Sequence, residues 1–165
     1  EKRVAWLCEE YGEGAFPTPE QLAEASEQEL REARFGYRAK YLPALAREVL
    51  EKSEWTDEVK KMSLSDARVF LTQFTGVGEK IADCVLLYGL GFKQAFPIDT
   101  HILQVLQEKY GLKDSNYRRL TQFALEKFGE HAGYAQQYLF YDHLVSSKKQ
   151  KSKTQQITLK PKSIK

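Results

Sequence analysis

Apolar residues along this chain recur every three or four positions, which is the spacing of one face of an α-helix. One such stripe runs from Val4 to Tyr11, and another joins Tyr41, Leu45 and Leu50. Strict alternation of apolar and polar residues, the pattern of a half-buried strand, is scarce. The spacing therefore predicts an all-α fold of roughly eight or nine helices.

Small polar residues that can cap a helix precede most of these stripes. The predicted caps are Thr18 (followed by Pro19), Ser26, Ser63 or Ser65, Asp99, and Asp114 or Ser115. We expect helices over residues 66–73, 79–90, 100–110, 115–128 and 131–146. In the first of these, Val69, Phe70 and Phe74 are expected to point inward.

Charge is distributed unevenly along the 165 residues, which carry a net charge of +2. Residues 1–35 hold four basic and nine acidic side chains, whereas residues 146–165 hold seven lysines and no acid. We predict one helical domain over residues 1–146, then a disordered Lys-rich tail over residues 147–165. The tail could attract nucleic acid in a salt-sensitive way, or it could simply be a solvated end.

Several classes of protein are disfavoured by composition. No apolar run approaches the ~20 residues that cross a bilayer, so no membrane association is expected. Cys8 and Cys84 form no spaced framework, so neither a disulfide nor a zinc site is indicated. We expect an intracellular protein, in the nucleus of a eukaryote or the cytoplasm and nucleoid of a prokaryote. Because residues 2–11 already have the pattern of a helix inside a protein, we also expect an upstream segment.

The segment 74–84, FTGVGEKIADC, combines a Gly-x-Gly turn with the start of a helix. Gly76 and Gly78 permit positive φ and let a phosphate approach the main chain. The N–H groups of Gly76, Gly78 and Lys80 then favour an anion. Carbonyl groups that could hold a K⁺ or Na⁺ ion bridging to that phosphate belong to Thr72, Phe74 and Val77. A plain helix-loop-helix turn is the alternative interpretation, because a lone Gly-x-Gly is weak evidence.

Lys80 and Asp99 are the candidate chemical groups. A lysine in the first turn of a helix is electrostatically misplaced, and partial burial would add to this by disfavouring the ammonium form. Both effects would supply a neutral amine that can act as a nucleophile. Asp99 is also a normal N-cap for the helix that follows it, and the two roles are compatible because a capping carboxylate is rigidly aimed.

Three further blocks extend this pattern: residues 96–101 (FPIDTH), 36–41 (GYRAKY) and 132–140 (AGYAQQYLF). Together with residues 74–84 they resemble the helix-hairpin-helix DNA glycosylases, and most closely the 8-oxoguanine DNA glycosylase/lyase branch. The resemblance covers about residues 1–145 and places the helix-hairpin-helix at residues 66–90. It implies an enzyme of base-excision repair that removes 8-oxoguanine and then nicks the strand.

The resemblance also implies roles for individual residues. Lys80 would attack C1′ of a flipped-out nucleotide and hold a Schiff base, while Asp99 would stabilise the charge that develops on the sugar. Gln136 would read the Watson–Crick edge of the extruded purine, with Phe140 and Cys84 packing on its two faces. From their pattern alone, the aromatic residue could equally be core and the glutamine an ordinary helix-surface residue.

The remaining implied contacts are with DNA. Tyr37 would wedge at the vacated step, Arg38 would contact the orphaned cytosine, and His101 would touch a backbone phosphate. The expected partner is double-stranded DNA with an oxidised purine opposite cytosine, bound by a monomer that needs no cofactor. Tyr37 too could instead be a core aromatic.

One departure and two alternatives accompany the resemblance. The family's smaller N-terminal domain, which contains a sheet, is not among the residues of this chain. We therefore expect the chain to be the catalytic helical part of a longer enzyme, with lesion discrimination and activity that depend on the part before it. The endonuclease III-like branch shares the lysine and aspartate, but no cysteine follows Cys84 to hold its usual iron–sulfur cluster. That branch without a cluster, or a non-catalytic DNA-binding module, are the alternatives.

Overall fold

The computed structural model describes residues 2–158, with side chains described over residues 2–147, and the regular structure of this part of the chain is helical throughout. The chain divides into two compact units, Glu1–Ala82 and Asp83–Lys165. The all-α prediction is confirmed. No helix among residues 2–158 combines the length and the apolar character that a bilayer span requires.

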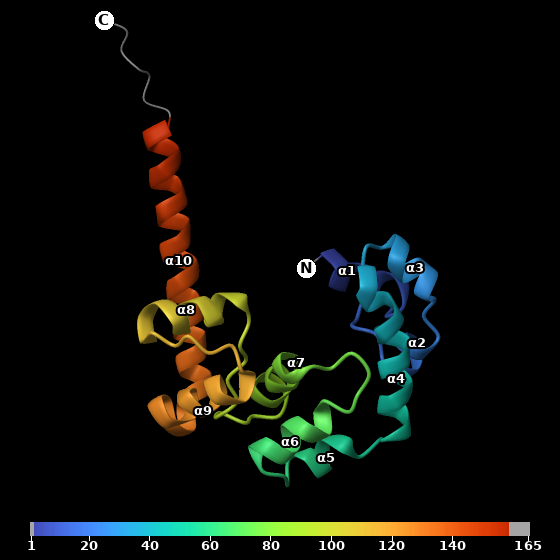
Figure 1. Cartoon of the computed structure of the whole chain (residues 1–165). Helices are drawn as coiled ribbons and strands as arrows, with labels where there is room; N and C mark the ends of the chain where they lie inside the picture. The colour runs from blue at the N-terminus through green and yellow to red at the C-terminus, as the bar shows by residue number, and fades with distance from the viewer. Residues whose placement is uncertain (1, 159–165) are drawn as a thin grey trace, which may run out of the picture. The chain divides into compact units, whose positions relative to one another are not determined.

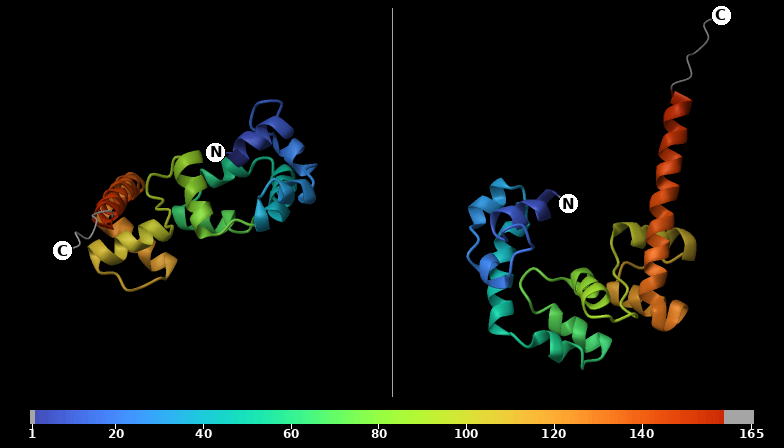
Figure 2. Two further views of the ribbon diagram at one scale, coloured as in Figure 1. Left: turned by 90° about the horizontal axis from the view of Figure 1, so that it is seen from above. Right: turned by 180° about the vertical axis from the view of Figure 1, so that it is seen from behind.

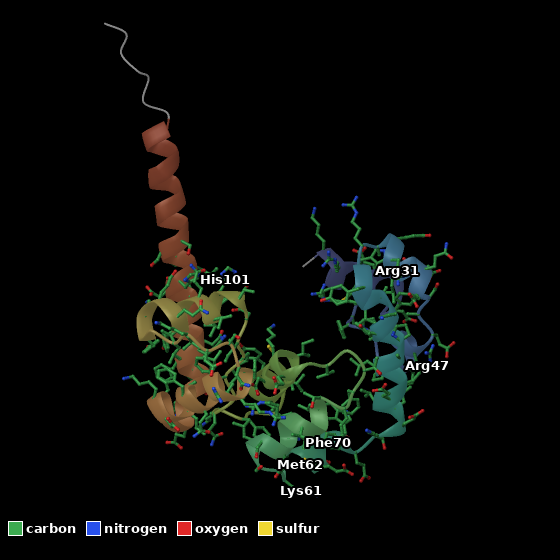
Figure 3. The ribbon with its side chains drawn as sticks, viewed as in Figure 1. Arg31, Arg47, Lys61, Met62, Phe70 and His101 are labelled. Carbon is green, nitrogen blue, oxygen red and sulfur yellow. The ribbon has the colours of Figure 1, made fainter. Side chains whose placement is uncertain are left out.

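The first unit contains seven helical segments and the start of an eighth (Figure 1). They are α1 (Lys2–Glu10), α2 (Pro19–Ala23), α3 (Glu27–Glu32), the 3₁₀ segment η1 (Gly36–Lys40), α4 (Tyr41–Glu51), α5 (Trp55–Val59), α6 (Leu64–Leu71) and the beginning of α7 (Glu79–Cys84). α2 packs against α4, and η1 packs against both α3 and α4. Arg47 of α4 donates a hydrogen bond to the Ala23 carbonyl at 2.8 Å, which ties α4 to the end of α2 (Figure 3).

The second unit contains the π-helical segment η2 (Val85–Gly89), α8 (Thr100–Tyr110), α9 (Tyr117–Phe128), the 3₁₀ segment η3 (Gly129–His131) and α10 (Ala132–Thr158). α8 and α9 both pack against α10. Their shared core is built of buried apolar side chains, among them Phe96, Ile102 and Leu120. Loop residue Phe96 stacks on Phe128 with ring centroids 6.1 Å apart. The loop before α8 is thereby anchored in the core.

Most predicted caps are confirmed. Thr18 and Gln21 form a reciprocal capping box, Ser63 rather than Ser65 caps α6, and Asp99 caps α8, which spans Thr100–Tyr110 as predicted. The cap of α9 was wrongly predicted. Asn116 caps it, because the Asp114 carboxylate instead accepts hydrogen bonds from the Asn116 N–H and from Arg119.

Two predictions about the middle of the chain were also wrong. Val69 is exposed, whereas Phe74 is buried and Phe70 is half-buried, so only the aromatic residues of this stripe face the core. The helix α5 was not predicted at all. It is a single short turn packed through Val59, too brief for apolar periodicity to reveal.

The last helix extends well past the predicted end at residue 146. α10 is described to Thr158, and residues 159–165 lie outside the described part of the chain. The right-hand view of Figure 2 shows α10 as one continuous rod. Propagating an existing helix costs far less than nucleating one, and lysine and glutamine are good helix formers.

Candidate active site

The hairpin between α6 and α7 is built around Gly76. The Val77 N–H donates to the Phe74 carbonyl at 3.1 Å, and Gly76 has φ of +79°. This is the position at which a type II turn requires positive φ. A Cβ on Gly76 would lie 2.9 Å from Cβ and Cγ of Tyr41. Glycine is therefore required at position 76 both by the backbone conformation and by the close packing of Tyr41.

Gly78 does not use the positive φ that a glycine permits, because its φ lies outside the left-handed region. Its carbonyl accepts the Ala82 N–H at 2.9 Å and so begins α7. A Cβ placed on Gly78 would meet no atom within 4 Å. The turn closes through Gly76 alone, and Gly78 leaves the space in front of α7 open.

These two glycines are expected to respond differently to alanine. Gly76→Ala should lower the free energy of unfolding by about 2–4 kcal/mol, because it combines a left-handed alanine with overpacking against Tyr41. Gly78→Ala should change it by less than about 1 kcal/mol. Chemical denaturation of both variants measures the difference. Equal losses of stability would contradict this assignment of the turn.

Glu48 of α4 holds the hairpin at Thr75. The Thr75 N–H donates to one carboxylate oxygen at 2.8 Å, and the Thr75 hydroxyl donates to the other. These bonds, the hydroxyl bond first and the N–H bond second, lower the pKa of Glu48. The hairpin is thus held to α4 at two points, by Glu48 at Thr75 and by Tyr41 at Gly76.

The Glu48 clamp is expected to weaken in acid. Because the folded-state pKa is below the ordinary value of 4.5, its stabilisation is complete above that pH and is lost as the pH falls through the lower folded value. Glu48→Gln should cost about 1 kcal/mol at pH 7. The difference in free energy of unfolding between wild type and variant should shrink below pH 4.5. A difference that stays constant from pH 7 to pH 3 would contradict the clamp.

Tyr37 and Arg38, the predicted DNA contacts, lie on η1 and are both exposed. The Arg38 guanidinium sits over the Tyr37 ring at 4.6 Å from its centroid. Tyr37 also meets Tyr41 edge to face, with centroids 6.2 Å apart. Since Tyr41 packs on Gly76, this exposed pair is linked to the hairpin through one shared tyrosine.

Lys80 is the second residue of α7, as predicted, and its side chain is exposed. The expected partial burial is therefore wrong. A side chain in the first turn of a helix leans toward the N-terminal end, away from the residues that pack beneath the helix. The unfavourable placement of a cation at a helix start still applies to this lysine.

Asp99 begins α8, and its Oδ1 accepts the Ile102 N–H at 2.8 Å. The residue before it is held as well, because the Ile98 N–H donates to the Tyr117 hydroxyl at 3.3 Å. That hydroxyl donates in turn to the fully buried carboxylate of Asp83 at 2.8 Å. Asp83 and Tyr117 thus support the loop that aims Asp99.

Neither support was predicted as functional. Asp83 falls within the motif at residues 74–84, and an aspartate inside an apolar helix is the signal that could have drawn attention to it. Tyr117 lies 34 residues further along and carries no comparable signal. Its role depends on how α9 packs.

The predicted base-pocket residues all belong to the second unit. Gln136 of α10 is only 5% exposed, and its amide donates to the Pro97 carbonyl at 3.0 Å. Cys84 and Phe140 are half-buried. The Phe140 ring lies edge to face with His101, which is labelled in Figure 3, and their centroids are 5.8 Å apart. Gln136, Phe140 and the exposed His101 therefore lie where α8 and the loop before it pack against α10.

Tyr88 of η2 is a further polar side chain of the second unit. Partial burial raises the pKa of its phenol first, and the charges of Cys84 and Asp99 raise it further. The hydroxyl also accepts a hydrogen bond from the Gln137 amide at 2.5 Å. Tyr88 thus lies near Cys84, Asp99 and Gln137. It was not predicted as functional from the sequence.

A metal centre built of side chains is not found within the described residues, where no three His, Cys, Asp or Glu side chains group together. Of the three carbonyl groups predicted for a monovalent cation, that of Phe74 already accepts the Val77 N–H. A second lone pair stays available on a carbonyl oxygen that accepts one hydrogen bond.

The sequence profile of the HhH-GPD superfamily of base excision DNA repair proteins matches residues 2–131. This chain belongs to that superfamily. The match spans both the hairpin with Lys80 and the loop with Asp99, so the two candidate chemical groups lie inside the family's region.

Individual HhH-GPD proteins show the same similarity. The N-glycosylase/DNA lyase OGG1 of Arabidopsis thaliana is 35% identical over 144 residues, covering 81% of this chain and 40% of the relative. The N-glycosylase/DNA lyase of Saccharomyces cerevisiae is 32% identical over 162 residues, covering 76% and 43%. The chain spans less than half the length of these two relatives.

A solved HhH-GPD structure has the same fold. It is the 8-oxoguanine glycosylase/lyase of Clostridium acetobutylicum in complex with double-stranded DNA containing cytosine opposite 8-oxoG. The TM-score is 0.80 at 31% identity, over 88% of this chain and 53% of that chain. The resemblance described from the sequence is thereby confirmed at the level of the family and the fold.

Proposed function

We propose that this chain is the helical catalytic part of a base-excision repair enzyme, a DNA glycosylase and AP lyase that removes 8-oxoguanine from double-stranded DNA. One observation carries the proposal: a lysine directly follows the Gly76 hairpin in a chain whose relatives are named N-glycosylase/DNA lyase. A pure DNA-gripping hairpin has no need of a nucleophile at that position.

Lys80 is the proposed nucleophile. Its Nζ forms a bond to C1′ as the glycosidic C1′–N9 bond breaks, and the base leaves with the electron pair and takes up a proton. The sugar then opens to a Schiff base on Nζ. Loss of a C2′ proton expels the 3′ phosphate and nicks the strand. The exposure of Lys80 in the free protein supports this role, because the amine is accessible to an incoming nucleotide.

Asp99 is the proposed electrostatic partner. Its Oδ1 is held by the Ile102 N–H, which leaves Oδ2 to face the positive charge developing on the sugar. A carboxylate aimed in advance needs little reorganisation during the reaction, so it stabilises the transition state efficiently. The buried Asp83 and Tyr117 pair keeps the preceding loop in place.

The flipped base is proposed to enter the second unit. Gln136 would read its Watson–Crick edge, while Phe140 and Cys84 would pack on its faces. Extruding a base costs a few kcal/mol, and such pocket contacts offset that cost. The buried amide of Gln136 supports this role, because a buried polar group presents its remaining hydrogen-bonding sites in a fixed direction.

The DNA backbone is proposed to lie along the hairpin. The open space in front of Gly78 supports phosphate approach there, with His101 at another phosphate and a K⁺ or Na⁺ ion on the Thr72, Phe74 and Val77 carbonyls. Tyr37 would fill the vacated step, and Arg38 would contact the orphaned cytosine. We further propose one functional domain over residues 1–146, acting as a monomer inside the cell.

Covalent trapping tests the proposal. The full chain is incubated with borohydride and a duplex carrying either 8-oxoguanine opposite cytosine or an abasic site. A covalent protein–DNA adduct with both duplexes is the expected result. Binding without an adduct would favour a non-catalytic module. An adduct with the abasic-site duplex but not with the 8-oxoguanine duplex would favour the endonuclease III-like alternative.

A further inference from the structure

A chain of hydrogen bonds crosses the second unit from the loop before α8 to η2. The Gln136 amide nitrogen donates to the Pro97 carbonyl at 3.0 Å, and its amide oxygen accepts from the Gln137 amide nitrogen. The same Gln137 nitrogen donates to the Tyr88 hydroxyl at 2.5 Å. Three side chains and one carbonyl thus form one continuous row.

The polarity of this row follows from its first member. A carbonyl oxygen only accepts hydrogen bonds, so the end of Gln136 that faces Pro97 is its NH₂ group. The other end of Gln136 is therefore its oxygen, which requires a donor. Gln137 supplies that donor with one amide proton, and Tyr88 accepts the other.

Gln136 alone would not hold this orientation as firmly. Its amide can turn by 180° about the last side-chain bond, which exchanges the donor and the acceptor. The turned state already places an oxygen against the Pro97 carbonyl, and Gln137 adds a second penalty because two NH₂ groups would then face each other. Gln137 is itself on the exposed side of α10, so Tyr88 is the contact that restrains it.

We propose that Gln137, held by Tyr88, is a positioning residue that locks the amide of Gln136 in one orientation and thereby selects a guanine-type base edge over an adenine-type edge. This inference rests on the proposed function of Gln136. Guanine and 8-oxoguanine present the acceptor O6 beside the donor N1–H, whereas adenine presents the donor N6–H₂ beside the acceptor N1. An amide of fixed orientation complements one of these edges and places like groups against the other.

The surroundings of Tyr88 fit this role. Its side chain is mostly exposed, and its phenol is protonated at neutral pH as in any tyrosine. The Tyr88 oxygen can therefore accept from Gln137 while its own proton is given to a different acceptor. The row of hydrogen bonds thus connects Gln136 to Gln137 and Tyr88.

The test compares Gln137→Ala, Gln137→Glu and Tyr88→Phe in the full chain. Gln122→Ala is the matched control, because Gln122 is an exposed glutamine of the same unit that donates to Glu126. Two single-turnover rates are measured for each: release of 8-oxoguanine opposite cytosine, and strand cleavage at an abasic site. Release of adenine from an otherwise identical duplex gives the selectivity.

Gln137→Ala should slow 8-oxoguanine release roughly tenfold, the effect of losing one or two orienting hydrogen bonds, while abasic-site cleavage stays within about twofold. Gln137→Glu should cause a larger loss, because a carboxylate favours the turned amide of Gln136 and so reduces the preference over adenine. Tyr88→Phe should have a smaller effect in the same direction, and Gln122→Ala none. Equal losses on both substrates, or unchanged rates in both Gln137 variants, would overturn the inference.

A spectroscopic measurement separates this inference from the proposed function. The side-chain NH₂ signals of Gln136 in an NMR spectrum, assigned with Gln136→Ala, should be dispersed in wild type and in Gln122→Ala. They should collapse toward free-amide positions in Gln137→Ala. If the wild-type chain shows no base release or adduct, the proposed function fails. If Gln136 signals are unchanged in Gln137→Ala, the positioning role fails by itself.

Discussion

Lys80→Gln is expected to abolish the borohydride-trapped adduct on both 8-oxoguanine and abasic-site duplexes. Only an amine can form the Schiff base that borohydride reduces, and glutamine has the nearest shape without that chemistry. Because Lys80 is exposed in the first turn of α7, the fold should be unaffected, with a change in the free energy of unfolding below about 0.5 kcal/mol. Denaturing gel analysis of the trapped product measures the effect.

Lys61→Gln is the matched control for this substitution. Lys61 is likewise an exposed lysine of the first unit, placed after α5 (Figure 3). It should retain the full yield of adduct. An undiminished adduct in Lys80→Gln would show that another amine is the nucleophile. Loss of adduct in both variants would point to a general effect of charge on DNA binding.

Asp99→Asn is expected to slow base release by roughly 10²–10³-fold while DNA affinity is kept, since removing one preorganised electrostatic partner has effects of this size. Asparagine caps a helix about as well as aspartate, so the Ile102 N–H keeps its acceptor and α8 is preserved. The variant thus removes the negative charge of residue 99 and leaves the structure of α8 unchanged. Single-turnover release of 8-oxoguanine measures the rate, and a binding titration measures the affinity.

Asp99→Ala separates the two roles of this residue. It removes the cap together with the charge and should cost about 1 kcal/mol of stability in addition to the loss of rate. A single-turnover rate in Asp99→Asn equal to that of wild type would contradict the electrostatic role. Equal stability of the Asn and Ala variants would contradict the cap.

The local features of this fold were determined by the sequence alone. The caps at Thr18, Ser63 and Asp99 and the turn at Gly76 were all predictable. A cap or a turn depends on hydrogen bonds and backbone conformations within three or four residues, so neighbouring side chains specify it. The family, too, was recognisable from four short blocks of sequence.

The side-chain contacts that join segments distant in the sequence were decided only by tertiary structure. Glu48 bonds Thr75 across 27 positions, and Tyr117 bonds Asp83 across 34. Gln137 bonds Tyr88 across 49 positions. No periodicity or cap marks such partners, because their contact exists only once helices have packed. The same holds for Val69, whose local sequence predicted an inward side chain while packing left it exposed. Neighbouring residues therefore determined the helix starts and the hairpin turn, whereas helix packing decided which side chains support the hairpin, Asp99 and Gln136.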